Sequence, residues 1–184
     1  EELTASGAAR VRVSFDVDIG RDSIHAYELL LEGVCGESRF HVRQMLWYIH
    51  GQLGFTIEDP HLWWVRGYGE PHRYEITATL LRDSKPVDML QWMQGLRTID
   101  LVREDQITGD HEAEFCFVLN GKRIFVKGTN WVPADAFHSN DMNRIPQILD
   151  LVWDVGCNAM RIWGGGVYES DYFYDWCDAR GILI

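Results

Sequence analysis

An arginine, a tryptophan and three consecutive glycines follow one another in residues 161–169, close to the end of the 184-residue sequence. A guanidinium can donate hydrogen bonds to several hydroxyl groups, and the face of an indole can line a sugar ring. Glycines leave space beside the backbone for a ligand. Their spacing matches neither the pattern G-x-G-x-x-G nor a phosphate-binding P-loop. The segment is therefore typical of a shallow polar pocket with an aromatic wall, such as a sugar site.

The chain that leads to Arg161 and Trp163 is a succession of predicted strands and helices. Asn120-Gly121, after an alternating apolar segment, is a strong signal for a two-residue hairpin. Apolar residues at helical spacing predict two helices further on. The expected elements are strands at 115–119, 124–127 and 159–163, helices within 141–155 and 170–181, and a shortened strand at 182–184.

Capping residues support both helices. Pro146 is tolerated only in a first turn, which predicts that the first helix starts near 142–145. Gly156 supplies its C-terminal stop. Ser170 is a suitable N-cap for the second helix, which Gly181 closes.

Strands that alternate with helices indicate a parallel sheet. Two such units and a third strand correspond to about a quarter of an eightfold (β/α)8 TIM barrel, which takes ~250 residues. We therefore expect residues 113–184 to form the N-terminal, truncated part of a TIM-barrel domain.

Barrel active sites lie at the carboxyl ends of the strands. The residues expected at this end are Asn130, Trp131 and Asp135 after the first strand, and Arg161 and Trp163 at the end of the second. They are the candidate substrate-binding residues, because an amide, a carboxylate and a guanidinium can bond sugar hydroxyls. The structural alternative is that Asp135 and Arg161 form an ion pair that only organises the loops.

The first part of the chain has a different pattern, in which apolar and polar residues alternate with period two. Several short alternating segments are separated by turn signals, as in residues 11–19 and 74–80. This spacing predicts that residues 1–112 form an immunoglobulin-like antiparallel β-sandwich. Residues 89–93 could belong to a strand or a helix.

Composition excludes several classes of partner. The net charge of −11 argues against nucleic acid and anionic membrane surfaces. No apolar run approaches the ~20 residues of a membrane span. The start at Glu1-Glu2 is not a native N-terminus, so the lack of a signal peptide is uninformative.

Cysteine and histidine spacing predicts no metal site and no cofactor. The four cysteines form no CxxC pair, and free thiols in the core are favoured over disulfides. A reducing compartment such as the cytoplasm then fits better than a secretory one, with lysosomal and periplasmic locations left open. The histidines are expected at the surface or bonded locally: His25, His41, His50, His61, His72, His111 and His138.

Several motifs resemble the family 2 glycoside hydrolases, and most closely the β-mannosidases among them. The matching segments are 60–64, 67–70, 95–98, 117–135, 161–169 and 173–178. They span nearly the whole chain and are most specific in its last part. The resemblance implies a multi-domain exo-glycosidase that removes terminal β-D-mannose, with a carbohydrate substrate as its partner.

The same resemblance places the chemistry outside these residues. Retaining enzymes of the family use two glutamates on later barrel strands, and the chain stops before either, so no catalytic residue is assigned. An N-terminal jelly-roll domain and the rest of the barrel would be further parts of the same polypeptide. The alternatives are another family 2 exo-glycosidase (a β-galactosidase, β-glucuronidase or exo-β-glucosaminidase) or a non-catalytic carbohydrate-binding or scaffold protein.

Overall fold

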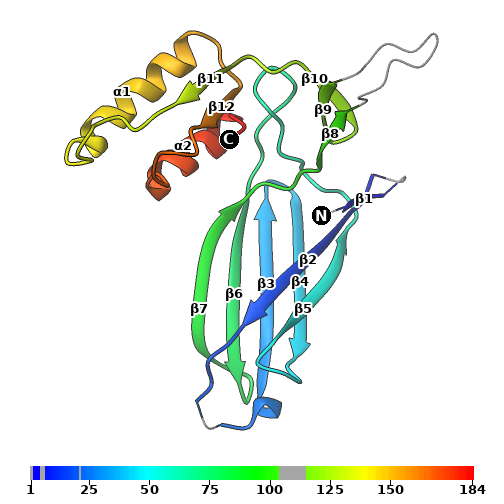
Figure 1. The fold of residues 1–184 in the computed structure, drawn as a ribbon. Coiled ribbons are helices and arrows are strands. Elements are labelled where there is room, and N and C mark those ends of the chain that lie inside the picture. Colours follow the sequence, from blue (N-terminus) through cyan, green and yellow to red (C-terminus); the bar gives the residue numbers. More distant parts are fainter. Residues whose placement is uncertain (1, 5–6, 21, 104–114) are drawn as a thin grey trace. The chain divides into compact units, whose positions relative to one another are not determined.

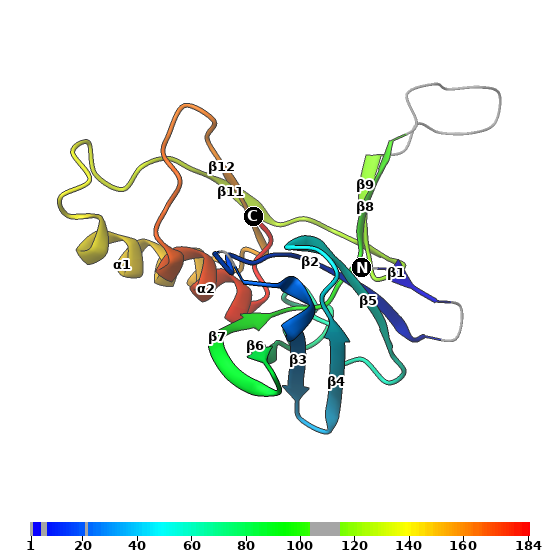
Figure 2. The same ribbon diagram turned by 90° about the horizontal axis from the view of Figure 1, so that it is seen from below.

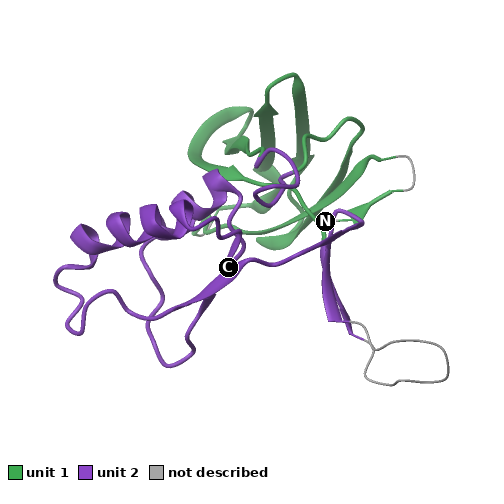
Figure 3. Ribbon diagram, turned by 90° about the horizontal axis from the view of Figure 1, so that it is seen from above, with its two compact units in different colours: residues 1–62, 72–98 green, residues 63–71, 99–184 purple. Residues whose placement is uncertain are grey.

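The computed structural model describes residues 2–4, 7–20, 22–103 and 115–184. They form two compact units (Figure 3). Unit 1 comprises Glu1–Leu62 and His72–Thr98, and unit 2 comprises Trp63–Pro71 and Ile99–Ile184. The expected position of His111 lies outside the described residues.

Unit 1 is a mostly antiparallel β domain of two facing sheets (Figure 1). The smaller sheet has the order β1-β2-β5 and the larger one β4-β3-β6-β7. The elements are β1 (Glu2–Leu3), β2 (Ala9–Asp16), the 3-10 helix η1 (Ile24–Ala26), β3 (Tyr27–Cys35), β4 (Ser38–Met45), β5 (His50–Ile57), β6 (Tyr74–Arg82) and β7 (Lys85–Gln94). The expectation of an antiparallel β domain is confirmed, and the ambiguous residues 89–93 belong to strand β7.

The core of unit 1 lies between the two sheets. Alternate residues of β3 are buried, as a strand with one covered face requires. Leu31 and Tyr74 of the larger sheet pack in one cluster with Leu53 and Ile57 of the smaller sheet. Each of these four side chains is at most 3% exposed.

Unit 2 contains a small antiparallel sheet and a parallel strand pair with two helices. Its elements are β8 (Ile99–Arg103), β9 (Phe115–Leu119), β10 (Lys122–Ile124), β11 (Gly128–Trp131), α1 (Asp141–Asp154), β12 (Ala159–Ile162) and α2 (Asp171–Arg180). Asn120 and Gly121 both have positive φ, as a two-residue type I′ turn demands, so the predicted hairpin is confirmed. Strand β8, which continues the alternating pattern of the sandwich, pairs instead with β9.

The tryptophan-rich segment, residues Trp63–Pro71, also belongs to unit 2. Trp63 is 3% exposed and packs with Val65, Leu119 and Leu183. Its indole N–H donates to the carbonyl of Asp178 at 2.7 Å. Trp63 is therefore a core residue of unit 2 rather than a candidate ligand-binding residue.

The prediction of a strand at 124–127 is wrong, because the first parallel strand is β11. The tight turn folds Ile124 back onto β9 as the end of β10. The Asn158 side chain then hydrogen-bonds the backbone of the next residues. It accepts from the Lys127 N–H at 2.8 Å and donates to the Phe125 carbonyl at 3.0 Å. Only from Gly128 does the chain pair with β12.

The later elements follow the sequence-based predictions closely. Strand β12 is parallel to β11, and Leu183 makes a parallel bridge to Ala159. Gly181 ends α2 with a positive φ of 70°. Helix α1 starts at Asp141, slightly earlier than expected, so Pro146 lies past the first turn. The described helices include none with the length and apolar character that a membrane span would need.

Candidate functional site

The parallel register brings two of the predicted site residues together. Asn130 of β11 is directly paired with Arg161 of β12. Both are exposed, whereas Trp131 and Met160, each one position away, are buried. Because side chains alternate along a strand, Asn130 and Arg161 lie on the face away from the core. An amide and a guanidinium therefore stand side by side on one open surface.

The opposite face of the strand pair is covered by both helices (Figure 2). Trp131 is 3% exposed, and its ring centroid lies 4.7 Å from that of Phe173 in α2. Its indole N–H donates to Oε1 of Glu169 at 2.7 Å. Trp131 thus anchors the loop before α2, and its direct contact with a sugar stays a prediction.

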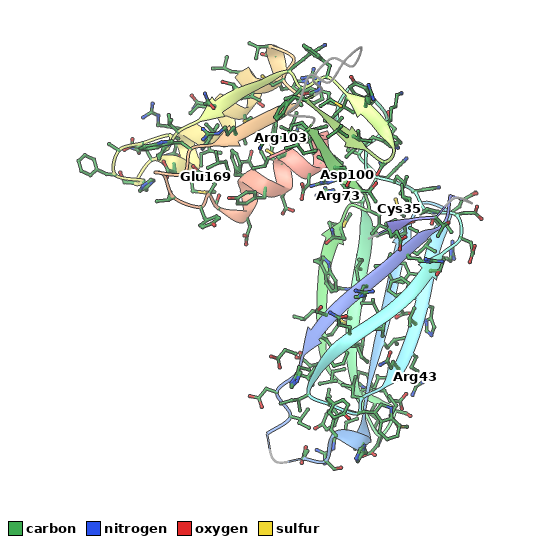
Figure 4. All side chains as sticks on the ribbon, turned by 45° about the vertical axis from the view of Figure 1, so that its right-hand side comes forward. Cys35, Arg43, Arg73, Asp100, Arg103 and Glu169 are labelled. Carbon is green, nitrogen blue, oxygen red and sulfur yellow. The ribbon has the colours of Figure 1, made fainter. Side chains whose placement is uncertain are left out.

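Glu169 was missed as a member of this site. It lies in the loop between β12 and α2 (Figure 4). The available signal was its place at the end of the motif that begins with Arg161. A carboxylate that accepts from a buried indole fixes the loop in which Trp163 and the glycines lie.

Asp135 organises the loop that leads into α1. Its Oδ1 accepts from the backbone N–H of Phe137 at 3.0 Å, and its Oδ2 lies 3.4 Å from Nη1 of Arg144. The Phe137 N–H lowers the pKa of Asp135 most, and the Asn140 amide and the Arg144 guanidinium lower it further. Its ion-pair partner is thus Arg144 rather than Arg161. The part of the chain that the structure describes offers Arg161 no ion-pair partner.

Trp163 follows β12 directly and is 50% exposed. Its backbone N–H donates to the carbonyl of Trp131 at 2.9 Å, which fixes where its side chain starts. Of the three glycines after it, Gly165 makes room for the indole, because a Cβ there would lie 2.4 Å from the Trp163 ring. A Cβ on Gly166 would touch Pro133 at 3.3 Å. The Trp163 ring therefore rests on the backbone of its own loop.

Comparison with known proteins decides the family. The model of the glycosyl hydrolases family 2 matches residues 2–97. The chain belongs to glycosyl hydrolases family 2. The resemblance noted from the sequence motifs is thereby confirmed.

Individual relatives within the family extend the match over the rest of the chain. Beta-mannosidase B of Thermothelomyces thermophilus is 33% identical over 185 aligned residues, which cover 100% of this chain and 20% of that protein. Beta-mannosidase of Capra hircus is 41% identical over 125 residues, 66% of this chain and 14% of the relative. The chain therefore spans a fifth or less of these relatives.

A solved structure also matches nearly the whole chain. The beta-D-mannosidase of Dictyoglomus thermophilum superposes with a TM-score of 0.73 at 26% identity, over 95% of this chain and 22% of that one. Its match includes both the β-sandwich and most of unit 2.

Proposed function

We propose that the chain is part of a retaining exo-glycosidase, a β-mannosidase that hydrolyses terminal β-D-mannose residues. The observation that carries the proposal is the alignment of the whole chain, at 33% identity, with a relative named beta-mannosidase B. The other exo-glycosidases of family 2 are the second candidate, because an exo-beta-D-glucosaminidase also matches in structure with a TM-score of 0.69.

We propose further that residues 113–184 begin a TIM barrel that follows the β domain of unit 1 in the sequence. The order β11-α1-β12-α2, with the bridge at Leu183 continuing the sheet beyond β12, supports this. In such a barrel the helices lie outside, so the face opposite to them is the interior. The exposed pair Asn130 and Arg161 would then point into the barrel.

These positions suit substrate binding rather than bond cleavage. Asn130 and Arg161 can hold sugar hydroxyls, and Trp163 can present an indole edge or face beside them. Trp131 and Asp135 would act mainly by fixing the two loops around them. The acid/base and the nucleophile, two carboxyl groups about 5–5.5 Å apart in a retaining enzyme, would come from later strands. No cofactor is needed for this chemistry.

A substrate panel tests the proposal on the full-length protein that carries this chain. The aryl β-mannoside should be hydrolysed with a kcat/KM at least about 100-fold above those of the matching galactoside, glucuronide and glucosaminide. If another of these sugars is preferred, that sugar rather than mannose is the substrate. The absence of turnover on all four would favour a non-catalytic carbohydrate-binding or scaffold role.

The isolated 184-residue chain is the matched control. It should leave the aryl β-mannoside intact, since it would lack both carboxylates. Turnover by the pure chain, abolished in Asp135→Asn, would contradict the proposed division of roles.

A further inference from the structure

Unit 1 brings one cysteine and two histidines together from three separate parts of the chain. The possible ligand atoms of Cys35, His61 and His72 all lie within 4.8 Å of one another. The centroids of the two imidazole rings are 5.0 Å apart. Cys35 is the last residue of β3, where Figure 4 labels it, and the histidines lie on either side of the tryptophan-rich segment.

The backbone around the three residues is firmly held. The Tyr74 hydroxyl, fully buried, accepts from the His61 backbone N–H at 2.9 Å and lies 2.6 Å from the Ser38 hydroxyl. Ser38 in turn donates to the carbonyl of Asp59 at 2.6 Å. This chain of hydrogen bonds ties the segment that carries His61 to the larger sheet, beside the end of β3.

The turn after Cys35 leaves room for the His61 ring. Gly36 has a φ of +59°, and a Cβ there would lie 3.3 Å from Cε1 of His61. Cys35 pairs with Ser38 across this two-residue turn. Burial raises the pKa of the Cys35 thiol, and the backbone N–H of Arg73 offsets part of this rise. The site is thus shaped around the cysteine and the imidazole.

We propose that Cys35, His61 and His72 bind a zinc-type divalent ion that clamps the β3–β4 turn to the segments before and after residues 63–71. One thiolate and two imidazoles are a typical zinc donor set, and they disfavour Mg²⁺ and Ca²⁺, which prefer oxygen ligands. A tetrahedral ion would draw the donor atoms to about 3.5 Å from one another, which small side-chain rotations achieve. The fourth position is open to water. On binding, the Cys35 S–H proton passes to solvent and a sulfur–metal bond replaces it.

Sequence spacing gave no hint of this cluster. Zinc motifs are recognised when ligands stand a few residues apart, whereas here one ligand ends β3 and the other two lie eleven residues apart in the connection between β5 and β6. Cys35 is buried, His61 is half-buried and His72 is exposed. An ion could therefore bind from the surface with little disturbance of the fold. The ion would be held at the surface, with one ligand in contact with water.

Cobalt titration of the metal-free 184-residue chain tests the proposal. One equivalent of Co²⁺ should produce a thiolate-to-metal charge-transfer band and intense tetrahedral ligand-field bands, and Zn²⁺ should displace it. His72→Ala removes an exposed ligand without disturbing the core and should weaken Zn²⁺ binding more than 100-fold, since even outer partners of metal ligands are worth 10–100-fold. Cys35→Ser should abolish the charge-transfer band.

Two control variants and a second measurement keep the test sharp. His50→Ala and Cys116→Ser, which change a histidine and a cysteine elsewhere, should bind like the wild type. Zn²⁺ at about a hundredfold excess over the wild-type Kd should raise the Tm of unit 1 by at least about 5 °C in the wild type, and by no more than about 3 °C in His72→Ala. Absence of the cobalt bands, or equal affinities of His72→Ala and His50→Ala, would overturn the proposal. Neither result would bear on the β-mannosidase proposal, which rests on the alignment of the chain with beta-mannosidase B.

Discussion

The two units of the chain differ in how completely their sheet strands are paired with neighbouring strands. In unit 1 the central strand β3 is paired on both sides, with β4 and β6. In unit 2 strand β11 is paired only with β12 among the described residues, and its first three residues are exposed. Large apolar side chains are exposed in both units, such as Phe137 at 86% in unit 2 and Tyr48 at 74% in unit 1, so strand pairing is what distinguishes them.

This difference indicates which unit carries a scaffold and which carries a surface for further structure. An unpaired, exposed strand edge is a place where another strand can add. Under the proposed function, the rest of the barrel covers β11 and leaves Asn130, Arg161 and Trp163 at its mouth. The sandwich needs no such completion to build its core.

We expect the largest loss of stability from a substitution in the sandwich core. Leu53 is fully buried between the sheets. Leu53→Ala should lower the free energy of unfolding by about 3–5 kcal/mol, because a closed core cannot collapse around the cavity. Leu149→Ala in unit 2 should cost nearer ~2–3 kcal/mol, since α1 can relax towards solvent. Hydrogen exchange resolved over residues 50–57 and 141–154 measures both, and the reverse order would break the comparison.

A smaller effect should come from the hydrogen bonds that hold His61 against the larger sheet. Tyr74→Phe leaves the His61 N–H and the Ser38 hydroxyl short of a partner in a buried place. This should cost about 2 kcal/mol in urea unfolding. Tyr48→Phe, at a tyrosine that is 74% exposed, is the control and should change stability by less than ~0.5 kcal/mol. Equal costs for the two variants would show that the network does not hold the sandwich.

The smallest effect concerns the loop of Asp135 in unit 2. Its folded-state pKa is lowered, so its stabilising contribution is present above its unfolded pKa of about 4 and is lost as pH falls through the folded value. Asp135→Asn should therefore lower the urea midpoint at pH 7 but make little difference near pH ~2. Asp150→Asn, at an exposed position of α1, is the control and should change the urea midpoint little at pH 7. A constant difference for Asp135→Asn at all pH values would contradict its role as a charged loop anchor.

The sequence predicted the elements better than their partners. Period-two alternation marks a strand with one covered face, so β2 and β6 were recognisable from their own residues. Helix α2 was equally predictable, because Ser170 marks its start and Gly181 marks its end. Which strand β8 joins depends on side-chain packing far along the chain, and its alternation alone gives no partner.

The candidate site was predictable to a similar extent. The face shared by Asn130 and Arg161 follows from two strands in parallel register. The roles of Trp131 and Asp135 depend on contacts with Glu169 and Arg144, which strand periodicity does not reveal. Burial of Trp131 could have been foreseen only by placing β11 four residues later than its apolar pattern suggested.

The central claim is that Trp163 and the exposed face beside it contribute to a sugar site. Trp163→Ala in the full-length protein tests this most directly, with kcat/KM on an aryl β-mannoside and Tm measured on the same preparation. The account predicts a fall in kcat/KM of about 100-fold with an unchanged Tm, because a half-exposed ring that positions substrate is lost while the core stays intact. A loss of stability of roughly 3–5 kcal/mol, with normal kcat/KM in the remaining folded protein, would make Trp163 a packing residue and contradict the claim.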